Sequence, residues 1–236
     1  MSEEHASPDL FTFAELTPYE RYKMLCACVV PRPIAWITSL SDTGTVNAAP
    51  FSFFNVFAED PALVIVGVDR KKGGGVKDTI VNVRATGAFT VNLADMASID
   101  ALVATAALFP PDRSEPEALG LALEPGRTNA VPRLAEAPVS LECRLFELRE
   151  LSETRHLVLG EVTGLVSRAG VYDRETLHID PSAYQPIARL HGASYAGLAT
   201  PFEKPVPDWE TAVDAATGGA YASRTSVQTR PEDPAS

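Results

Sequence analysis

The residues best suited to chemistry in this sequence are Lys77, Asp78 and Thr79, which stand where a helix is predicted to begin. Asp78 or Thr79 opens the segment TIVNVRAT, and Gly87 provides its stop signal. A helix N-terminus presents free backbone N–H groups and the positive end of the helix dipole, so it can bind a phosphate, and Lys77 would add a full charge. The alternative interpretation is ordinary helix capping beside a solvated lysine.

A glycine-rich loop, Gly73–Gly75, comes just before this helix start. A phosphate-binding P-loop has two glycines separated by four residues and followed by Lys-Ser or Lys-Thr. The segment GGGVKDT has neither that spacing nor that pair, so the sequence argues against a P-loop.

A second group of small and polar residues is Asn47-Ala48-Ala49-Pro50. Asn, Ala and Pro are poor strand formers, although the neighbouring residues favour a strand. Small side chains let a flat ring approach the backbone, and a flavin ring needs backbone N–H and C=O groups along its edge and an apolar wall beneath it. The alternative is a bulged edge strand that binds no ligand.

These small residues belong to a predicted hairpin that runs from Pro31 to Ser52. PRPIAWITS begins as a stiff extended segment, because proline fixes its backbone torsion and lacks an N–H group, and continues as a strand. Asp42-Thr43-Gly44 closes the turn, and Pro50 confines the return strand to an edge, a bulge or a strand end. Arg32, with Thr38 and Ser39, gives this hairpin a third polar cluster.

Hydrophobic periodicity predicts the elements that must position these groups. A short helix opened by Thr17 and Pro18 precedes the hairpin, as an outer helix or arm. Strands are expected at 61–69, 88–94, 138–151 and 156–166, and helices from residue 78 to Gly87 and over 95–108. Residues 109–133 read as a surface loop, and Gly160 and Gly164 as bends or sites of close approach. Five or six strands with two inserted helices indicate a closed or split antiparallel barrel.

The composition narrows the possible partners of the chain. Its 236 residues carry a formal net charge of −11, which opposes nucleic-acid binding because that binding depends on Lys and Arg neutralising phosphates. No segment approaches the ~18 continuous apolar residues of a membrane span, and the acidic N-terminus lacks a secretory pattern, so we expect a cytoplasmic protein without membrane contact. Three cysteines without a paired spacing indicate reduced thiols and no metal site.

The order of motifs resembles the flavin reductase-like family, and its flavoredoxin-type branch most. The matching segments are PRPIAWITS, NAAPFSFFN, GGGVKDT, PVSLECRL, HLVLGEV and RLHGASY, which cover about residues 17 to 197. This resemblance implies a mainly β fold, the FMN-binding split antiparallel β-barrel with a few peripheral helices. The expected organisation is an N-terminal arm or helix over 1–22, the barrel domain over 23–200, and an extended tail over 201–236 whose last fifteen or so residues are disordered.

The resemblance also implies a homodimer with FMN in a groove near the subunit interface, and NADH or NADPH as the co-substrate. The residues expected to bind the cofactor are Arg32, Trp36, Thr38, Ser39, Asn47, Ala48, Ala49, Pro50, Phe51, Ser52, Lys77, Asp78, Thr79, His191 and Tyr195. His156 corresponds to a family histidine on the nicotinamide side, which makes it the candidate catalytic residue. The stretch from His191 to Tyr195 departs from the Gly-Gly pair that the family often has there.

The resemblance therefore predicts a flavin reductase that transfers a hydride from NAD(P)H to flavin and passes the electrons onward, with a monooxygenase or an electron-transfer protein as partner. The alternative is an FMN-binding electron carrier of the flavoredoxin kind, which a protein partner reduces. A third hypothesis, from another class, is a barrel that binds no cofactor and serves in interactions. Glu142 and Glu161 also lie in strand patterns and could form a catalytic carboxylate pair, but nothing in the sequence fixes the distance between them, so they are not chosen as site residues.

Overall fold

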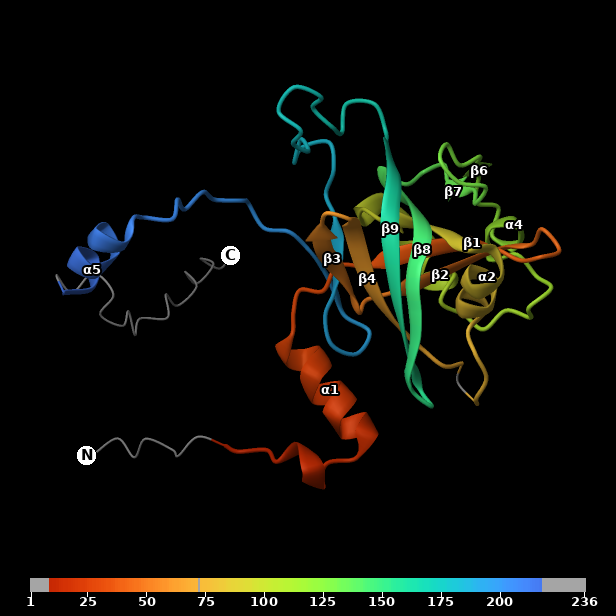
Figure 1. Ribbon diagram of the computed structural model, residues 1–236, viewed down its shortest axis with the longest axis horizontal. Coiled ribbons are helices and arrows are strands. Elements are labelled where there is room, and N and C mark those ends of the chain that lie inside the picture. The colour runs from red at the N-terminus through yellow and green to blue at the C-terminus, as the bar shows by residue number, and fades with distance from the viewer. Residues whose placement is uncertain (1–8, 72, 218–236) are drawn as a thin grey trace, which may run out of the picture. The chain divides into compact units, whose positions relative to one another are not determined.

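A computed structural model describes residues 9–71 and 73–217 of the chain, which divides between Leu198 and Ala199 into two units (Figure 1). In the first unit the helices, with η for a 3₁₀ helix, are η1 (Phe13–Glu15), α1 (Pro18–Cys28), α2 (Asp78–Thr86), η2 (Met96–Ser98), α3 (Ile99–Ala104) and α4 (Glu115–Ala118). Its strands are β1 (Ala35–Leu40), β2 (Val46–Phe51), β3 (Phe54–Glu59), β4 (Ala62–Asp69), β5 (Ala88–Leu93), β6 (Leu123–Glu124), β7 (Arg133–Leu134), β8 (Val139–Ser152), β9 (Arg155–Ser167), β10 (Ile187–Arg189) and β11 (Tyr195–Gly197). In the second unit the structure describes α5 (Trp209–Thr217).

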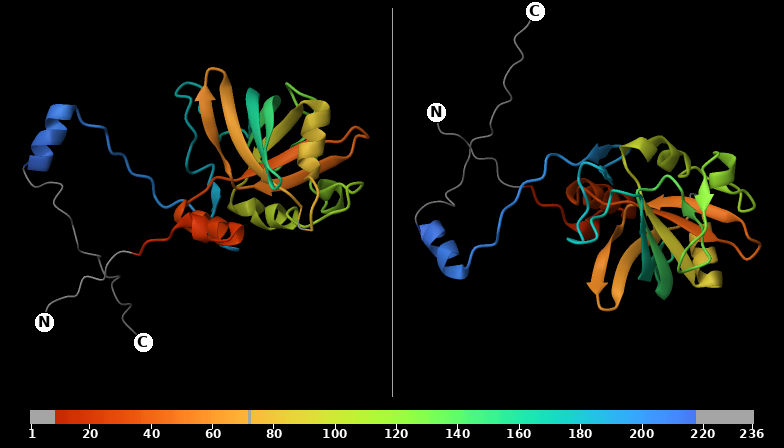
Figure 2. Two further views of the ribbon diagram at one scale, coloured as in Figure 1. Left: turned by 60° about the horizontal axis from the view of Figure 1, so that its bottom comes forward. Right: turned by 90° about the horizontal axis from the view of Figure 1, so that it is seen from above.

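Seven strands form one antiparallel sheet in the order β2-β1-β5-β8-β9-β4-β3. Such a sheet can bury one face by curling around a core. Figure 2 shows the strands wrapped into a barrel from two further sides, with α1 lying outside it. The expected mainly β fold is therefore confirmed.

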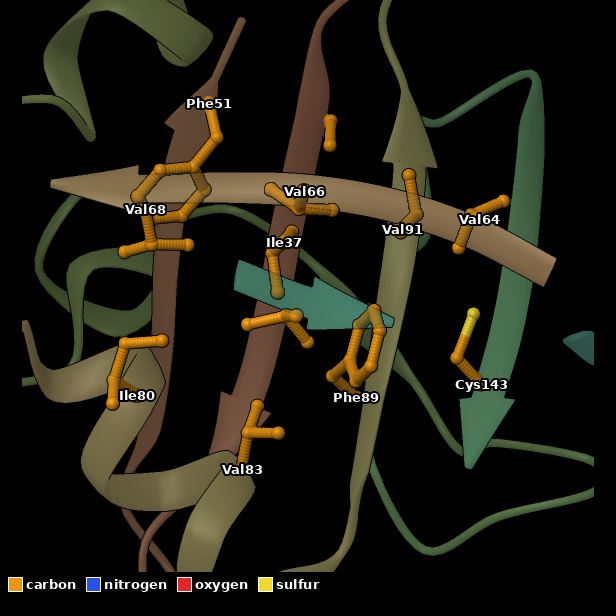
Figure 3. Close-up of a cluster of buried hydrophobic side chains, with 12 residues drawn as sticks. Ile37, Phe51, Val64, Val66, Val68, Ile80, Val83, Phe89, Val91 and Cys143 are labelled. Atoms are coloured by element: carbon orange, nitrogen blue, oxygen red, sulfur yellow. The ribbon is translucent and has the colours of Figure 1, made fainter. Parts of the chain in front are cut away.

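The core lies where β4 passes across β1, β2 and β5 (Figure 3). Alternate residues of β4 point into it, since Val64, Val66 and Val68 are all buried. They meet the side chains of Phe89 and Ile80, which arrive from β5 and α2. Because the buried positions follow the period of two, the register of β4 is fixed, and its other face is left for the groove described below.

Gly160 is a site of close approach, as its sequence context predicts. A Cβ atom there would lie 2.3 Å from Cζ of Phe89, inside the core. Gly164 has the same property, because a Cβ atom would lie 2.7 Å from the Thr128 side chain. These glycines let the long β8–β9 hairpin pack against β5 on one side and against the loop before β7 on the other.

Local sequence signals place the helices that border the site. Thr17 caps α1 through a capping box, in which its hydroxyl accepts from the Glu20 N–H and the Glu20 carboxylate accepts from the Thr17 N–H. Gly87 ends α2 in the left-handed conformation at φ 68°, where a residue without a side chain fits best. Both predicted helix boundaries are confirmed.

Three expectations differ from the structure, and one edge strand was missed. The helix expected over 95–108 is shorter and divides into η2 and α3. The segment 109–133, expected as a surface loop, contains α4 and β6 and buries Ser114, Glu115 and Val131. The edge strand β3 was not predicted, because Val56 and Phe57 are exposed and give FNVFAE no in–out pattern. In the tail, α5 occupies part of the segment expected to be extended, and the last fifteen residues lie outside the described part.

Candidate functional site

The predicted hairpin forms one wall of a groove. β1 and β2 pair in antiparallel register, with Thr38 opposite Ala48 and Trp36 opposite Pro50, and β2 lies at the edge of the sheet. Along this edge the structure has two adjoining cavities, of about 340 and 150 Å³. Both are lined by Pro50, Asp69 and Ala106, so they form one continuous groove.

The smaller cavity contains the predicted phosphate-binding residues. Lys77 is the N-cap of α2, and Lys77, Asp78 and Thr79 all line this cavity. The carboxylate of Asp78 is held by Lys71 at 2.7 Å, across the glycine loop. Within residues 9–71 and 73–217, the Lys77 ammonium has no hydrogen bond or ion pair. Because a helix N-terminus and an uncompensated cation meet here, this end of the groove is suited to an anion.

A network of buried polar side chains holds the walls of the smaller cavity. Asn47 donates from Nδ2 to Oε1 of Glu115 at 2.9 Å and accepts at Oδ1 from the Thr79 hydroxyl at 2.9 Å. The other oxygen of Glu115 accepts from the backbone N–H of Ala48, also at 2.9 Å. Glu115 thus joins the short helix α4 to the outer edge of β2 and fixes Asn47 beside α2.

The larger cavity has an apolar and aromatic wall with two arginines. The end of β2 contributes Pro50 and Phe51, the next residue is Ser52, and Tyr195 lies in the same lining, so all four predicted residues border this cavity. Tyr22 and Phe53 add two further rings, whose centroids are 6.1 Å apart. The guanidinium groups come from Arg155 and Arg189, which the sequence analysis did not single out. This cavity can accommodate a flat ring against Pro50 and Phe51.

Three predicted cofactor ligands instead make structural contacts in the barrel wall. Arg32 is buried and donates to the carbonyl oxygens of Cys26, Val29 and Leu190 at 2.7–2.8 Å. The Thr38 hydroxyl donates to the carbonyl oxygen of Pro132 at 2.7 Å, and Ser39 accepts from Asn82 at 3.1 Å. Arg32, Thr38 and Ser39 line neither cavity of the groove.

Three further candidates are also placed away from the groove. The side chain of Ala48 is fully buried, and its N–H is occupied by Glu115. His191 is exposed in the turn between β10 and β11 and does not line either cavity. His156 is only 1% exposed and pairs with Val68, so it faces the barrel interior. Its strand neighbour Arg155 points the opposite way, into the groove.

Trp36 is a core residue that anchors the groove wall. Its indole Nε1 donates to the Thr105 hydroxyl at 2.9 Å, just after α3. α3 and the residues after it supply Leu102 to the larger cavity and Ala106 to both. Trp36 therefore acts on the groove through α3.

We expect Trp36→Phe to lower the free energy of unfolding by about 1–2 kcal/mol, because the buried hydrogen bond to Thr105 and part of the ring volume are lost. Urea unfolding followed by circular dichroism measures this change. Replacing Trp209 by Phe in the second unit, where the ring is 74% exposed, is the matched control and should leave the transition of the barrel in place. An unchanged midpoint for Trp36→Phe would contradict the anchoring role.

Several groove residues were missed by the sequence analysis. Arg189 opens the motif RLHGASY but was not singled out, and the others lie outside the recognised motifs: Tyr22, Asp69, Lys71, Leu102, Ala106, Glu115 and Arg155. For Arg155 a signal was present, because His156 and Val158 alternate with Arg155 and Leu157 along one strand. For Glu115 there was none, since a carboxylate in an acidic, proline-rich loop reads as a surface residue.

Comparison with known proteins identifies the class to which this fold and groove belong. The family model described as flavin reductase like domain matches residues 27–188, and the chain therefore belongs to the flavin reductase-like family. This confirms the resemblance of the sequence motifs. The uncharacterized protein YwrF of Bacillus subtilis is 38% identical over 198 residues, which are 82% of this chain and 96% of that protein.

Two similar solved structures are more than 30% identical to this chain. The 2-nitrobenzoate 2-nitroreductase NbaA of Pseudomonas fluorescens is 34% identical with a TM-score of 0.78, over 85% of this chain and 98% of that one. Nitrilotriacetate monooxygenase component B of Bacillus cereus is 33% identical, also with a TM-score of 0.78, over 84% and 99%.

More distant structures show the fold alone. A flavin reductase with a split barrel domain from Shewanella frigidimarina has a TM-score of 0.72 at 19% identity, over 82% of this chain and 96% of that one. Flavoredoxin of Desulfovibrio vulgaris has a TM-score of 0.64 at 17% identity, over 75% and 91%. The predicted split barrel is thereby confirmed. In the part of the chain that the structure describes, no helix is long and apolar enough to cross a bilayer.

Proposed function

We propose that this protein binds FMN in the groove along β2 and acts as an NAD(P)H-dependent flavin reductase. The observation that carries the proposal is the pairing of two unlike ends in one groove. Lys77 stands unpaired at the start of α2, and Pro50 and Phe51 form a flat wall in the adjoining cavity. A phosphate at the first end and a planar ring at the second are the two parts of FMN.

The residues present fit this cofactor in charge and in shape. Lys77 and the N–H groups at the start of α2 would hold the phosphate, while Asn47 and Thr79 hold that end rigid through Glu115. When bound, the flavin would accept a hydride from the reduced nicotinamide and pass the electrons onward. The role of the protein is to position the two rings and to exclude water, so no acid–base residue is required. His156 is accordingly not assigned a catalytic role, since it faces the core.

The test of the proposed function begins with purified protein, FMN and either NADH or NADPH. We expect the absorbance of the reduced nicotinamide to fall, and added FMN to raise the melting temperature because a ligand that binds only the folded state stabilises it. If neither nicotinamide is oxidised while FMN binds, the electron-carrier alternative holds. A melting temperature that does not change when FMN is added would instead support the hypothesis of a barrel that binds no cofactor.

We also propose that the protein is a homodimer. A third, apolar cavity of about 480 Å³ adjoins the groove at Ser52, Phe53 and Gly67. Leu25 of α1 and Val29 directly after α1 line this cavity and are 48% and 59% exposed, as expected for a face that another copy covers. Light scattering coupled to gel filtration measures the mass, and a monomer at micromolar concentration would refute the dimer.

The similar structures suggest two fates for the electrons. The similar protein from Pseudomonas fluorescens is named as a nitroreductase, and the one from Bacillus cereus as a component of a monooxygenase. We accordingly propose either a partner monooxygenase that takes the reduced flavin or a small acceptor that reacts at the groove itself.

A further inference from the structure

The two arginines of the larger cavity are not explained by the phosphate of FMN. Arg155 and Arg189 line this cavity only, whereas Lys77 lines only the smaller one. A phosphate bound by Lys77 would therefore leave a second positive region in the adjoining cavity. The acidic residue in the same lining, Asp69, forms no ion pair with either arginine among the residues that the structure describes.

Arg155 is placed in the groove by the alternation of β9. It lies opposite Asp69 of β4 in the strand register, on the face turned away from the core. Its guanidinium lies 4.8 Å from the centre of the Phe53 ring, and in the described ranges no hydrogen bond or ion pair holds this side chain. A half-buried charge without a partner is costly, so an anion bound beside it would be stabilised.

Arg189 lies in the hairpin of β10 and β11, and its side chain is held by more contacts than that of Arg155. It lies 4.4 Å from the centre of the Tyr195 ring, and it donates to the Tyr195 hydroxyl and to the carbonyl oxygen of Gly192. These contacts fix the plane of the guanidinium. A planar guanidinium is well matched to a planar carboxylate, which it can bind through two parallel N–H groups.

The remaining lining indicates what carries the anion. Apart from the wall of Pro50 and Phe51 assigned to the flavin, the rings of Phe53 and Tyr22 border the same cavity of about 340 Å³ as the arginines. A ring packed on these side chains would have its anionic group within the same small space. This arrangement favours a carboxylate attached directly to an aromatic ring over a pyrophosphate, which in a dinucleotide is separated from the ring by a sugar.

We infer that the larger cavity is a binding site for an aromatic carboxylate, with Arg155 as the residue that selects its negative charge and Arg189 as the second contact. Its position beside a bound flavin rests on the proposed function. Recognition of the carboxylate by the two arginines does not, because it depends only on the lining of this cavity.

The experiment uses benzoate as the probe and benzamide as its uncharged counterpart, each titrated by calorimetry into the full-length protein with and without FMN. Benzoate is expected to bind more tightly than benzamide. Arg155→Met should weaken benzoate about 10- to 100-fold, as expected for the loss of a charge-assisted contact, and leave benzamide nearly unchanged. Arg149→Met is the matched control, because it removes the same charge from an exposed site outside the cavity.

Arg155→Lys separates charge from shape and guards against a misfolded methionine variant. It keeps the charge but loses the planar fork, so we expect benzoate affinity between those of the wild type and Arg155→Met. Equal binding of benzoate and benzamide, or equal effects of the Arg155 and Arg149 variants, would overturn the inference. So would a rise in the KM for NAD(P)H in Arg155→Met with benzoate affinity unchanged, since Arg155 would then serve the dinucleotide.

The two proposals fail in different ways. Benzoate binding that depends on Arg155 in a protein that does not bind FMN would support this inference and refute the flavin reductase. FMN binding and NAD(P)H oxidation without any preference for benzoate would support the reductase and refute the carboxylate site.

Discussion

Glutamine in place of Glu142 is expected to lower the free energy of unfolding by about 2–4 kcal/mol. Glu142 is fully buried, and its carboxylate accepts from the backbone N–H groups of Arg127 and Thr128 and from the Thr128 hydroxyl at 2.8 Å. An amide places a donor against these donors, so at least one buried group loses its partner. The loop before β7 would then be released from β8.

Urea unfolding at neutral pH measures this loss. Glu147→Gln is the control, since Glu147 lies on the same strand with a side chain that is 46% exposed, and its effect should stay within about 0.5 kcal/mol. Indistinguishable midpoints for the two variants would show that Glu142 does not fasten the loop.

The contribution of Glu142 should also depend on pH. Burial by itself raises the pKa of this carboxyl, but the N–H groups of Arg127 and Thr128 outweigh burial and hold the pKa below its ordinary value of 4.5. A group with a lowered folded-state pKa stabilises the protein fully above its unfolded pKa, and this stabilisation is lost as the pH falls through the folded pKa. The difference between wild type and Glu142→Gln should therefore be constant near neutrality and shrink below about pH 4.5.

Alanine in place of Lys77 is expected to weaken FMN binding by about 1.5–3 kcal/mol, which is roughly a 10- to 150-fold rise in the dissociation constant. Lys77 is the N-cap of α2, its side chain forms no hydrogen bond or ion pair in the described ranges, and it lines the smaller cavity. Its removal should therefore cost little stability, while the phosphate loses its charged partner. Quenching of flavin fluorescence on titration with protein measures the affinity.

Two further measurements make this prediction specific. Riboflavin, which lacks the phosphate, should bind the wild type and Lys77→Ala equally well. Lys204→Ala, which removes an exposed charge in the second unit, should leave the FMN affinity unchanged. Equal FMN affinity in the wild type and Lys77→Ala would favour the alternative interpretation of the sequence, in which Lys77 is a solvated lysine beside an ordinary helix cap.

The sequence could predict those features of the site that depend on residues close together in the chain. The hairpin turn at Gly44, the start of α2 at Lys77 and its end at Gly87 each depend on local backbone preferences, so short segments were enough to locate them. The apolar wall at Pro50 and Phe51 followed from the same hairpin.

The rest of the site depends on contacts between distant segments. Thr38 and Arg32 looked like ligands because both are polar, yet in the folded chain they donate hydrogen bonds to the carbonyl groups of Pro132 and Leu190. Glu115 looked like a surface residue, yet the edge of β2, nearly seventy positions away, buries it, as its hydrogen bond to Ala48 spans 67 residues. No local pattern encodes such partners, because they are defined only when the barrel closes.

The attachment of Glu115 to β2 also bears on how this protein avoids unwanted assembly. In an antiparallel strand alternate residues turn their N–H groups to the same edge, so Ala48 and Pro50 hold neighbouring outward positions. The N–H of Ala48 is occupied by the Glu115 carboxylate, and Pro50 has no N–H. An incoming strand therefore does not find these two donors, which it would need to extend the sheet. The edge that is closed to polypeptide in this way stays open to small planar molecules.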